Sequence, residues 1–394
     1  MTNAERVQVL LDRGVVIPAP DQVFVDADVS VDAIAAGSVL HPGTRLEGAR
    51  TFMAPGAEAG SAGPATVRNC VLGHGAKLGS GLFEGAVLFD GASFGPCCHA
   101  RDGTLLEEGA SVAHASGTKQ TVLLPFATLG SNINCCDALL AGGTGPQDHS
   151  EIGSGFIHFN FTPHGVAGDK ATPSLFGDVP RGVWLREKRI FLGGAGGVVG
   201  PAQVGFGTVL AAGSVWRRNK GEGVLALAER LPERELVFNA SREGRPREKL
   251  KANLRYIGNL CALRAFHQEV RLPLAGQDAA RRHVVQAAIA LLAASVEERV
   301  KQMDRWIQGL NGAGEAEALR RAWPHLAVAL RRLECAAVPD ALRAALRAAP
   351  SHPAAATFGP VIPWLSALPE ATLTAGREWL AVSVQWRIAL SQYE

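Results

Sequence analysis

Tyrosine is scarce in this chain of 394 residues, which contains two of them. No apolar run in the sequence approaches the ~18 residues that a membrane-spanning helix requires. The first residues do not form a signal peptide. The formal net charge of +2 gives no strong argument for binding nucleic acid. We therefore expect a cytoplasmic protein with neither a membrane nor a nucleic-acid partner.

Disulfide spacing is absent as well. The chain has seven cysteines, an odd number, and four of them form two adjacent pairs at 97–98 and 135–136. This pattern fits free thiols in a reducing compartment better than a disulfide framework. Cys98 falls on the repeat described next, where we expect a small apolar core residue.

A period of six residues dominates the segment 82–117. Apolar residues recur at every sixth position, and a small residue stands four places after each of them. The apolar positions are Leu82, Leu88, Phe94, Ala100, Leu106 and Val112. Since a helix repeats near 3.6 residues and a strand near 2, a period of six predicts short strands coiled three to a turn. Glycines at 85, 91, 103 and 109 suit the turns, where a positive φ is favoured without a Cβ.

The same period appears weakly before residue 82 and returns at 192–214, whereas the segment between 118 and 190 is interrupted by inserted loops. After Trp216 glycine becomes scarce, and alanine, leucine, arginine and glutamate dominate. We predict an N-terminal helix and linker (1–22), a β-helix with inserted loops at 118–190 (23–218), and an α-helical domain (219–394). Helices are expected at 246–272, 278–310, 315–335, 339–348 and 371–391, with prolines interrupting 350–363.

Polar residues gather in the interrupted segment, and such loops carry function more often than the scaffold does. The set is Lys119, Asn132, Asn134, Asp137, Gln147, Asp148, His149, His158, Asn160, His164, Asp169 and Lys170. Some of them also have a structural interpretation: Asn160 fits an internal asparagine ladder, and His158 fits a satisfied structural histidine. Arg101, on the regular repeat, likewise fits a solvated coil face.

Four stretches carry a resemblance to a known family. They are "VQVLLDRGVVIPAPDQVFVDADVSV" (7–31), "FGPCCHARDGT" (94–104), "IGSGFIHFNF" (152–161) and "VGPAQVGFGTVLAAGSV" (199–215). In this order they resemble the hexapeptide-repeat acyltransferases, and within them the acetyltransferase half of the bifunctional enzymes that make UDP-N-acetylglucosamine. The resemblance implies a left-handed parallel β-helix, usually assembled as a homotrimer, with acetyl-CoA as co-substrate.

In that family a sugar amine attacks the thioester of acetyl-CoA, a histidine removes the proton of the amine, and basic residues bind the sugar phosphate. The resemblance implies roles residue by residue: Arg101 and Lys119 for the phosphate, Asn160 and Phe161 near the reacting acyl group, Lys170 for the sugar, and Gly194 and Ala212 for CoA. The expected ligand is therefore a sugar phosphate or a nucleotide-sugar.

The general base departs from the family pattern. When "SNINCCDALL" (131–140) is aligned with the family's "KVNHLSY", Asn134 precedes the base position and Cys135 occupies it. An unperturbed thiol is a poor base for an amine at neutral pH. His149 and His158 are the available substitutes, and we expect the inserted loop at 142–149 to bring the first of them to the same edge.

Three hypotheses remain open: an N-acyltransferase, a sugar-nucleotide-binding protein that has lost its base, and a β-helix that only trimerises the helical tail. A zinc site resembling that of hexapeptide-repeat carbonic anhydrases would need a close histidine pair. The spacing of His114, His149, His158 and His164 does not provide one, so no metal is expected.

Overall fold

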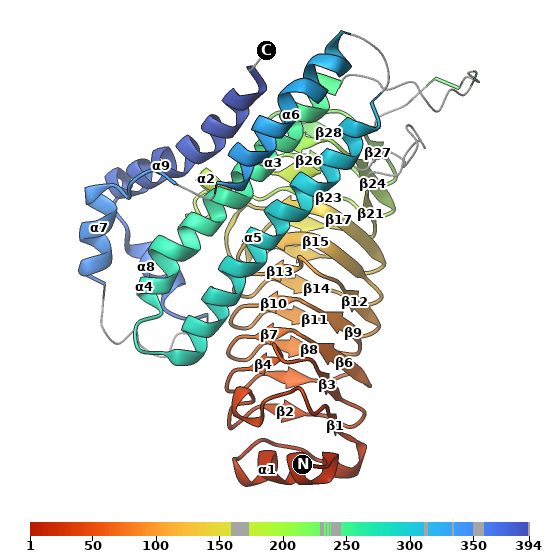
Figure 1. Ribbon diagram of the computed structural model, residues 1–394, viewed down its shortest axis with the longest axis vertical. Helices are drawn as coiled ribbons and strands as arrows, with labels where there is room; N and C mark the ends of the chain where they lie inside the picture. The colour runs from red at the N-terminus through yellow and green to blue at the C-terminus, as the bar shows by residue number, and fades with distance from the viewer. Residues whose placement is uncertain are drawn as a thin grey trace.

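The computed structural model is a parallel β-solenoid along which a helical domain is laid (Figure 1). It describes residues 1–158, 173–228, 246–310, 314–332, 335–349 and 358–392, together with residues 232, 233, 235 and 237. The N-terminus lies at one end of the solenoid, and the helical domain comes after the last coils in the chain. The predicted fold class, a β-helix of hexapeptide repeats followed by helices, is confirmed.

Three faces of short parallel strands form the solenoid. Face 1 contains β1 (Phe24–Val25), β3 (Arg45–Glu47), β6 (Ala65–Arg68), β9 (Gly81–Glu84), β12 (Cys98–Ala100), β15 (Gly117–Leu123), β17 (Ile133–Leu140), β21 (Gly155–His158), β24 (Gly196–Val199) and β27 (Val215–Trp216). Face 2 contains β4 (Phe52–Met53), β7 (Val71–Leu72), β10 (Val87–Leu88), β13 (Leu105–Leu106), β22 (Ser174–Phe176) and β25 (Gln203–Val204). Strands β15 and β17 continue around the corner from face 1 into face 2.

Face 3 is the 10-stranded sheet. It contains β2 (Val39–Leu40), β5 (Glu58–Ala59), β8 (Lys77–Leu78), β11 (Ser93–Phe94), β14 (Ser111–Val112), β16 (Thr128–Leu129), β20 (Glu151–Ile152), β23 (Phe191–Leu192), β26 (Val209–Leu210) and β28 (Leu225–Ala226). A separate antiparallel hairpin, β18 (Gly143–Gly145) with β19 (Asp148–His149), projects between faces 2 and 3. The chain thus runs from face 1 to face 2 to face 3 in every coil.

The six-residue period places one apolar side chain of each strand inside the prism. Leu72, Leu88 and Leu106 are paired in register on face 2 and are fully buried. Burial of a leucine stabilises the fold by about 1.5–3 kcal/mol relative to its exposed state. Leu82, which begins the repeat in the sequence, lies half-buried on face 1, and Phe83 is the residue that points inward there.

Helix α1 (Asn3–Asp12) closes the first coil. Thr2 and Glu5 form a capping box, in which each side chain bonds the other residue's backbone N–H. Arg6 Nε donates to the Val25 carbonyl at 2.8 Å, which satisfies a backbone acceptor of the first strand. The solenoid therefore does not end in an open apolar surface at this side.

Helix α2 (Val179–Gly182) is inserted within the solenoid. The helices after the solenoid are α3 (Pro246–Phe266), α4 (Leu272–Leu274), α5 (Ala279–Gln308), α6 (Glu315–Arg331), α7 (Asp340–Arg347), α8 (Val361–Ala367) and α9 (Glu370–Ala389). Short 3-10 segments are η1 (Pro20–Gln22), η2 (Val31–Ala33) and η4 (Leu390–Gln392), and η3 (His267–Arg271) is a π-helical turn. None of the described helices is long and apolar enough to cross a membrane.

Two helix predictions are corrected. The continuous helix expected at 246–272 is interrupted by η3, which continues α3 with π-type geometry. Of the prolines expected to interrupt 350–363, Pro350 and Pro353 lie outside the described residues, whereas Pro360 is the N-cap of α8 and Pro363 lies in its first turn. A helix does not use the N–H groups of its first turn, so proline is tolerated there.

The helical domain packs on face 2. Helix α5 contacts β7 and β10, and the outward residues Val71 and Val87 are only 5% and 4% exposed. On face 3, by contrast, Lys77 points outward and is exposed, and Ser93 is half-buried. Figure 1 shows α3 and α5 running alongside the solenoid. Among the described residues, face 2 is therefore an internal interface, and faces 1 and 3 carry the free surface of the solenoid.

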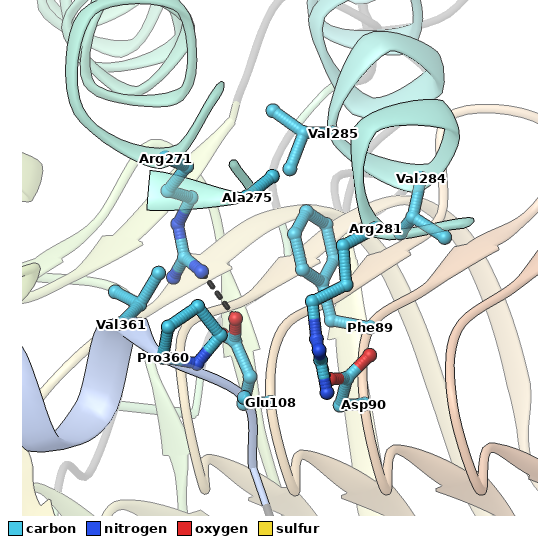
Figure 2. A pocket seen from close by; sticks show the side chains of 11 residues that line it. Phe89, Asp90, Glu108, Arg271, Ala275, Arg281, Val284, Val285, Pro360 and Val361 are labelled. Carbon is cyan, nitrogen blue, oxygen red and sulfur yellow. Dashed lines mark hydrogen bonds and ion pairs between the residues drawn. The ribbon is translucent and has the colours of Figure 1, made fainter. Parts of the chain in front are cut away.

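Buried charges join the two domains. Arg271 Nη2 lies 2.9 Å from Glu107 Oε2. Its Nη1 bonds Glu108, as Figure 2 shows. His267 Nε2 lies 2.9 Å from the other oxygen of Glu107, and all four side chains are at most 5% exposed. Burial raises the pKa of Glu108 to about 7. Burial would also raise the pKa of Glu107, but Arg271 and His267 hold it below its ordinary value.

Gly81 is expected to tolerate no side chain. It has a φ of +132°, and a Cβ there would lie 1.9 Å from the Cys98 carbonyl oxygen on the next coil. Gly81→Ala should lower the free energy of unfolding by about 3 kcal/mol, as measured by urea denaturation. Gly75→Ala is the matched control, because Gly75 has a φ of +63° with no atom within 4 Å of its Cβ position, and it should cost only about 1 kcal/mol. Equal losses in the two variants would contradict the steric argument.

Candidate functional site

A single row of outward residues runs along the corner between faces 1 and 2. The strand register pairs Glu47 with Arg68 and Arg68 with Glu84. The pairing of Phe83 with Ala100, and of Ala100 with Thr118, then sets Glu84, Arg101 and Lys119 on successive coils. Lys119 pairs with Cys136, and the pairing of Cys135 with Ile157 sets His158 one coil further. We call this row the charge ladder: Glu47, Arg68, Glu84, Arg101, Lys119 and Cys136, with the backbone of His158 at the next position along it.

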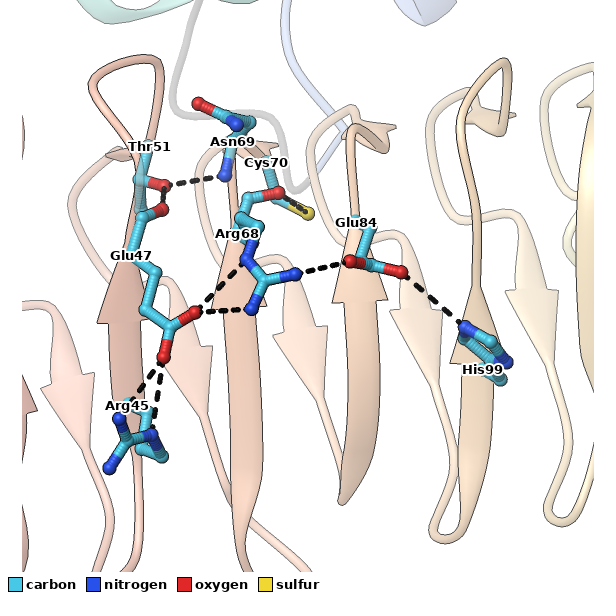
Figure 3. A network of polar contacts seen from close by, with 8 residues as sticks. All are labelled: Arg45, Glu47, Thr51, Arg68, Asn69, Cys70, Glu84 and His99. Atoms are coloured by element: carbon cyan, nitrogen blue, oxygen red, sulfur yellow. Dashed lines mark hydrogen bonds and ion pairs between the residues drawn. The ribbon is translucent and has the colours of Figure 1, made fainter.

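Opposite charges neutralise the N-terminal part of the charge ladder. Arg68 donates to Glu47 at 2.6 Å and to Glu84 at 2.6 Å, and Arg45 lies 3.2 Å from Glu47 (Figure 3). His99 Nε2 is 3.7 Å from the second oxygen of Glu84. These exposed pairs contribute little to stability individually, but they leave no net charge available for a ligand in this part.

Arg101 and Lys119 differ from this pattern. Within the described part of the chain neither side chain forms an ion pair, although they occupy consecutive coils. Arg101 Nη2 lies 3.8 Å from Cys136 Sγ, and its Nε is buried without a hydrogen-bond partner among the described residues. Charge-assisted bonds to an anion such as a phosphate would satisfy the unused donors of these two cations on adjacent coils.

The two adjacent cysteines point in opposite directions. Cys135 faces the interior and is 1% exposed, and burial raises the pKa of its thiol to about 12. Cys136 belongs to the charge ladder. Burial and Asp137 raise the pKa of its thiol above the ordinary value, while Arg101 and Lys119 act in the opposite direction. Both shifts favour the neutral thiol, which is a poor general base.

A second row on face 1 borders the charge ladder. The register aligns Gly117, Asn134, Phe156 and Gly197 on successive coils. Asn134 is exposed. The Phe156 ring covers Gly197, where a Cβ would lie 2.5 Å from the ring. Beside Arg101 and Lys119, face 1 thus offers an amide, an aromatic ring and a position without a side chain.

The predicted site residues fall into three groups. Arg101, Lys119, Asn134 and the backbone of His158 lie together on face 1 or at its corner with face 2. His149 does not, because its hairpin lies at the corner between faces 2 and 3, where His149 Nδ1 is 2.8 Å from the Pro146 carbonyl oxygen. This corrects the expectation that the loop at 142–149 reaches the same edge. Asn160, Phe161 and Lys170 lie outside the described residues.

The predicted CoA residues lie at the other border of face 1. Gly194 and Ala212 stand in successive turns between faces 3 and 1, and the Gly213 N–H donates to the Gly194 carbonyl at 3.1 Å. Ala212 is exposed and Gly194 half-buried. Face 1 therefore separates them from the charge ladder. No group of three metal-ligating side chains occurs among the described residues.

Comparisons with known proteins identify the relatives of this chain. No family model matches. The bifunctional protein GlmU of Nocardia farcinica is 31% identical over 215 residues, which are 55% of this chain and 38% of the relative. GlmU of Thermotoga petrophila is 26% identical over 211 residues, 53% of this chain and 41% of the relative. The chain is a hexapeptide-repeat protein.

This hexapeptide-repeat protein spans about two-fifths of the length of these curated relatives. Among solved structures, the polySia-specific acetyltransferase NeuO aligns with a TM-score of 0.24 and 12% identity, over 53% of this chain and 84% of that one.

The sequence interpretation missed Cys136. The inward–outward alternation of strand residues could have identified it. Ala100 points inward, and the strand register pairs Ala100 with Thr118 and Thr118 with Cys135. The next residue on each coil must then face outward, which gives Arg101, Lys119 and Cys136. In a hexapeptide-repeat protein, the positions of the inward residues therefore predict which residues point outward.

Proposed function

We propose that this chain is a CoA-dependent N-acyltransferase that acts on an amino-sugar phosphate or a nucleotide-sugar. The observation that carries the proposal is the pair of cations, Arg101 and Lys119, which stand on successive coils without an ion pair among the described residues. The relation to the bifunctional GlmU proteins supports acyl transfer as the reaction class.

The proposed chemistry follows the order of the charge ladder. Arg101 and Lys119 would hold the phosphate, and Asn134 would contact the sugar from face 1. We assign the general base to His158, because the register places it one coil beyond Cys136 and the two thiols have raised pKa values. The amine nitrogen attacks the thioester carbon, the C–S bond breaks, and the amine proton passes through His158 to the departing CoA sulfur.

The acyl carrier is assigned to the opposite border of face 1, where the turns at Gly194 and Ala212 present accessible backbone. A carrier bound there would direct its thioester across face 1 toward the charge ladder. Assembly as a homotrimer in the cytoplasm completes the proposal, and analytical ultracentrifugation tests the first part of it.

The enzyme hypothesis is tested by following CoA release from acetyl-CoA with glucosamine 1-phosphate as acceptor. His158→Gln should lower kcat by about 100-fold or more, as expected when a general base is removed. His149→Gln is the matched control, because its imidazole lies at a different corner, and kcat should stay within about twofold of that of the unmodified protein.

The outcomes distinguish the hypotheses. Equal loss in both histidine variants would contradict the assignment of His158. Thermal stabilisation by UDP-N-acetylglucosamine without any turnover would favour the sugar-nucleotide-binding protein instead.

A further inference from the structure

A buried ion pair joins the helical domain to the candidate site. Arg299 on α5 places its Nη2 2.8 Å from Asp137 Oδ1, with side chains 5% and 9% exposed. Asp137 directly follows Cys136 and turns the chain from face 1 into face 2 with a φ of +53°. A residue of another domain therefore meets the solenoid at the corner that carries the charge ladder.

A second contact joins the helical domain to the neighbouring coil, which carries Lys119. The Tyr256 hydroxyl on α3 donates to the Gln120 carbonyl at 3.4 Å, and Gln120 follows Lys119 with a φ of +49°. Tyr256 is buried. The two corners that present Lys119 and Cys136 are thus both held from the helical side, by α3 and by α5.

The charge of Asp137 acts on the same place as the two phosphate-binding cations. The pKa of the Cys136 thiol responds to Asp137, which raises it, and to Arg101 and Lys119, which lower it. Asp137 directly follows Cys136, whose Sγ lies 3.8 Å from Arg101 Nη2 and which pairs with Lys119, so its carboxylate competes with a phosphate for these cations unless its charge is balanced. Arg299 supplies that balance from α5.

We propose that Arg299 is a positioning residue of the phosphate site: by neutralising Asp137, it leaves Arg101 and Lys119 available to a phosphate ligand. The inference rests on the proposed function, because it assigns the helical domain a role in the same site. It goes beyond that function by placing a determinant of affinity on α5, which contributes none of the residues that touch the ligand.

Two single variants separate this electrostatic role from a structural one. Arg299→Met and Asp137→Asn both break the buried pair, so both should lower the thermal midpoint by a similar amount. Only Arg299→Met removes a positive charge while keeping the Asp137 carboxylate next to Cys136. Calorimetric titration with glucosamine 1-phosphate should therefore show at least about tenfold weaker binding for Arg299→Met and less than about threefold change for Asp137→Asn.

The double variant Arg299→Met/Asp137→Asn removes both charges and should restore binding to within about threefold of the unmodified protein. Equal losses of affinity in the two single variants would show that the ion pair has only a structural role, and would overturn the inference. If the unmodified protein binds glucosamine 1-phosphate only as weakly as Arg101→Met does, the proposed function fails. If it binds well and Arg299→Met binds equally well, the inference alone fails.

Discussion

Replacement of Arg271 by methionine is expected to lower the free energy of unfolding by about 3–5 kcal/mol at pH 8, because it leaves two buried carboxylates without their cation. Arg271 contacts both Glu107 and Glu108 across the interface between the domains. Without it, both carboxyl groups would have folded-state pKa values above the ordinary 4.5. Urea denaturation followed by far-ultraviolet circular dichroism measures the loss.

The same variant should be less destabilised at pH 5. A carboxyl group whose pKa is raised by folding binds more protons in the folded state than in the unfolded state, so its contribution to stability is lost as pH rises through the folded pKa. The difference between the unmodified protein and Arg271→Met should therefore widen from pH 5 to pH 8. Adding Glu107→Gln and Glu108→Gln to the variant should remove this pH dependence.

Arg331→Met is the control for this experiment. Arg331 pairs with Glu297 at 2.7 Å on the surface, with side chains 45% and 54% exposed. Exposed pairs are worth at most about 1 kcal/mol, so this variant should lose little at either pH. A loss in Arg271→Met that is as small, or that is the same at pH 5 and pH 8, would contradict the assigned role of the buried cluster.

The double variant Arg101→Met/Lys119→Met is expected to weaken binding of glucosamine 1-phosphate by about 100-fold or more. A hydrogen bond to a charged group contributes about 1.5–3 kcal/mol, and the variant removes at least two of them. Stability should change by less than about 0.5 kcal/mol, because neither side chain has an ion-pair partner among the described residues. Calorimetric titration gives the dissociation constants.

Arg45→Met provides the matched comparison within the solenoid. It removes a cation from the same face, but one that already pairs with Glu47. Its dissociation constant should equal that of the unmodified protein. A similar loss in Arg45→Met would mean that the general positive potential, and not the unpaired rungs, attracts the phosphate.

The sequence was sufficient to predict the solenoid because its core is a local rule repeated many times. Leu88 and Leu106 occupy equivalent positions on face 2 and pair in register, as a six-residue period requires. Arg101 and Lys119 were found from a resemblance, and the register then explains why they are neighbours. Cys135 was placed at the base position, whereas the alternation of strand residues turns it inward.

The packing of the helical domain against face 2 could not be predicted from sequence patterns. Arg271 and Glu108 are separated by 163 residues, and no periodicity relates them. The contact of Arg299 with Asp137 likewise depends on how α5 crosses face 2. An arginine in an amphipathic helix is ordinarily solvated, so its burial could not be inferred from its neighbours in the chain.

The covered state of face 2 limits how copies of this chain can associate. A closed ring needs two different patches on each subunit, one for each neighbour. With face 2 buried beneath α5, as Val71 and Val87 show, the solenoid can offer only its other two sides to such a ring. In a ring built on those two sides, the described helices that cover face 2 would lie away from the contacts between the prisms.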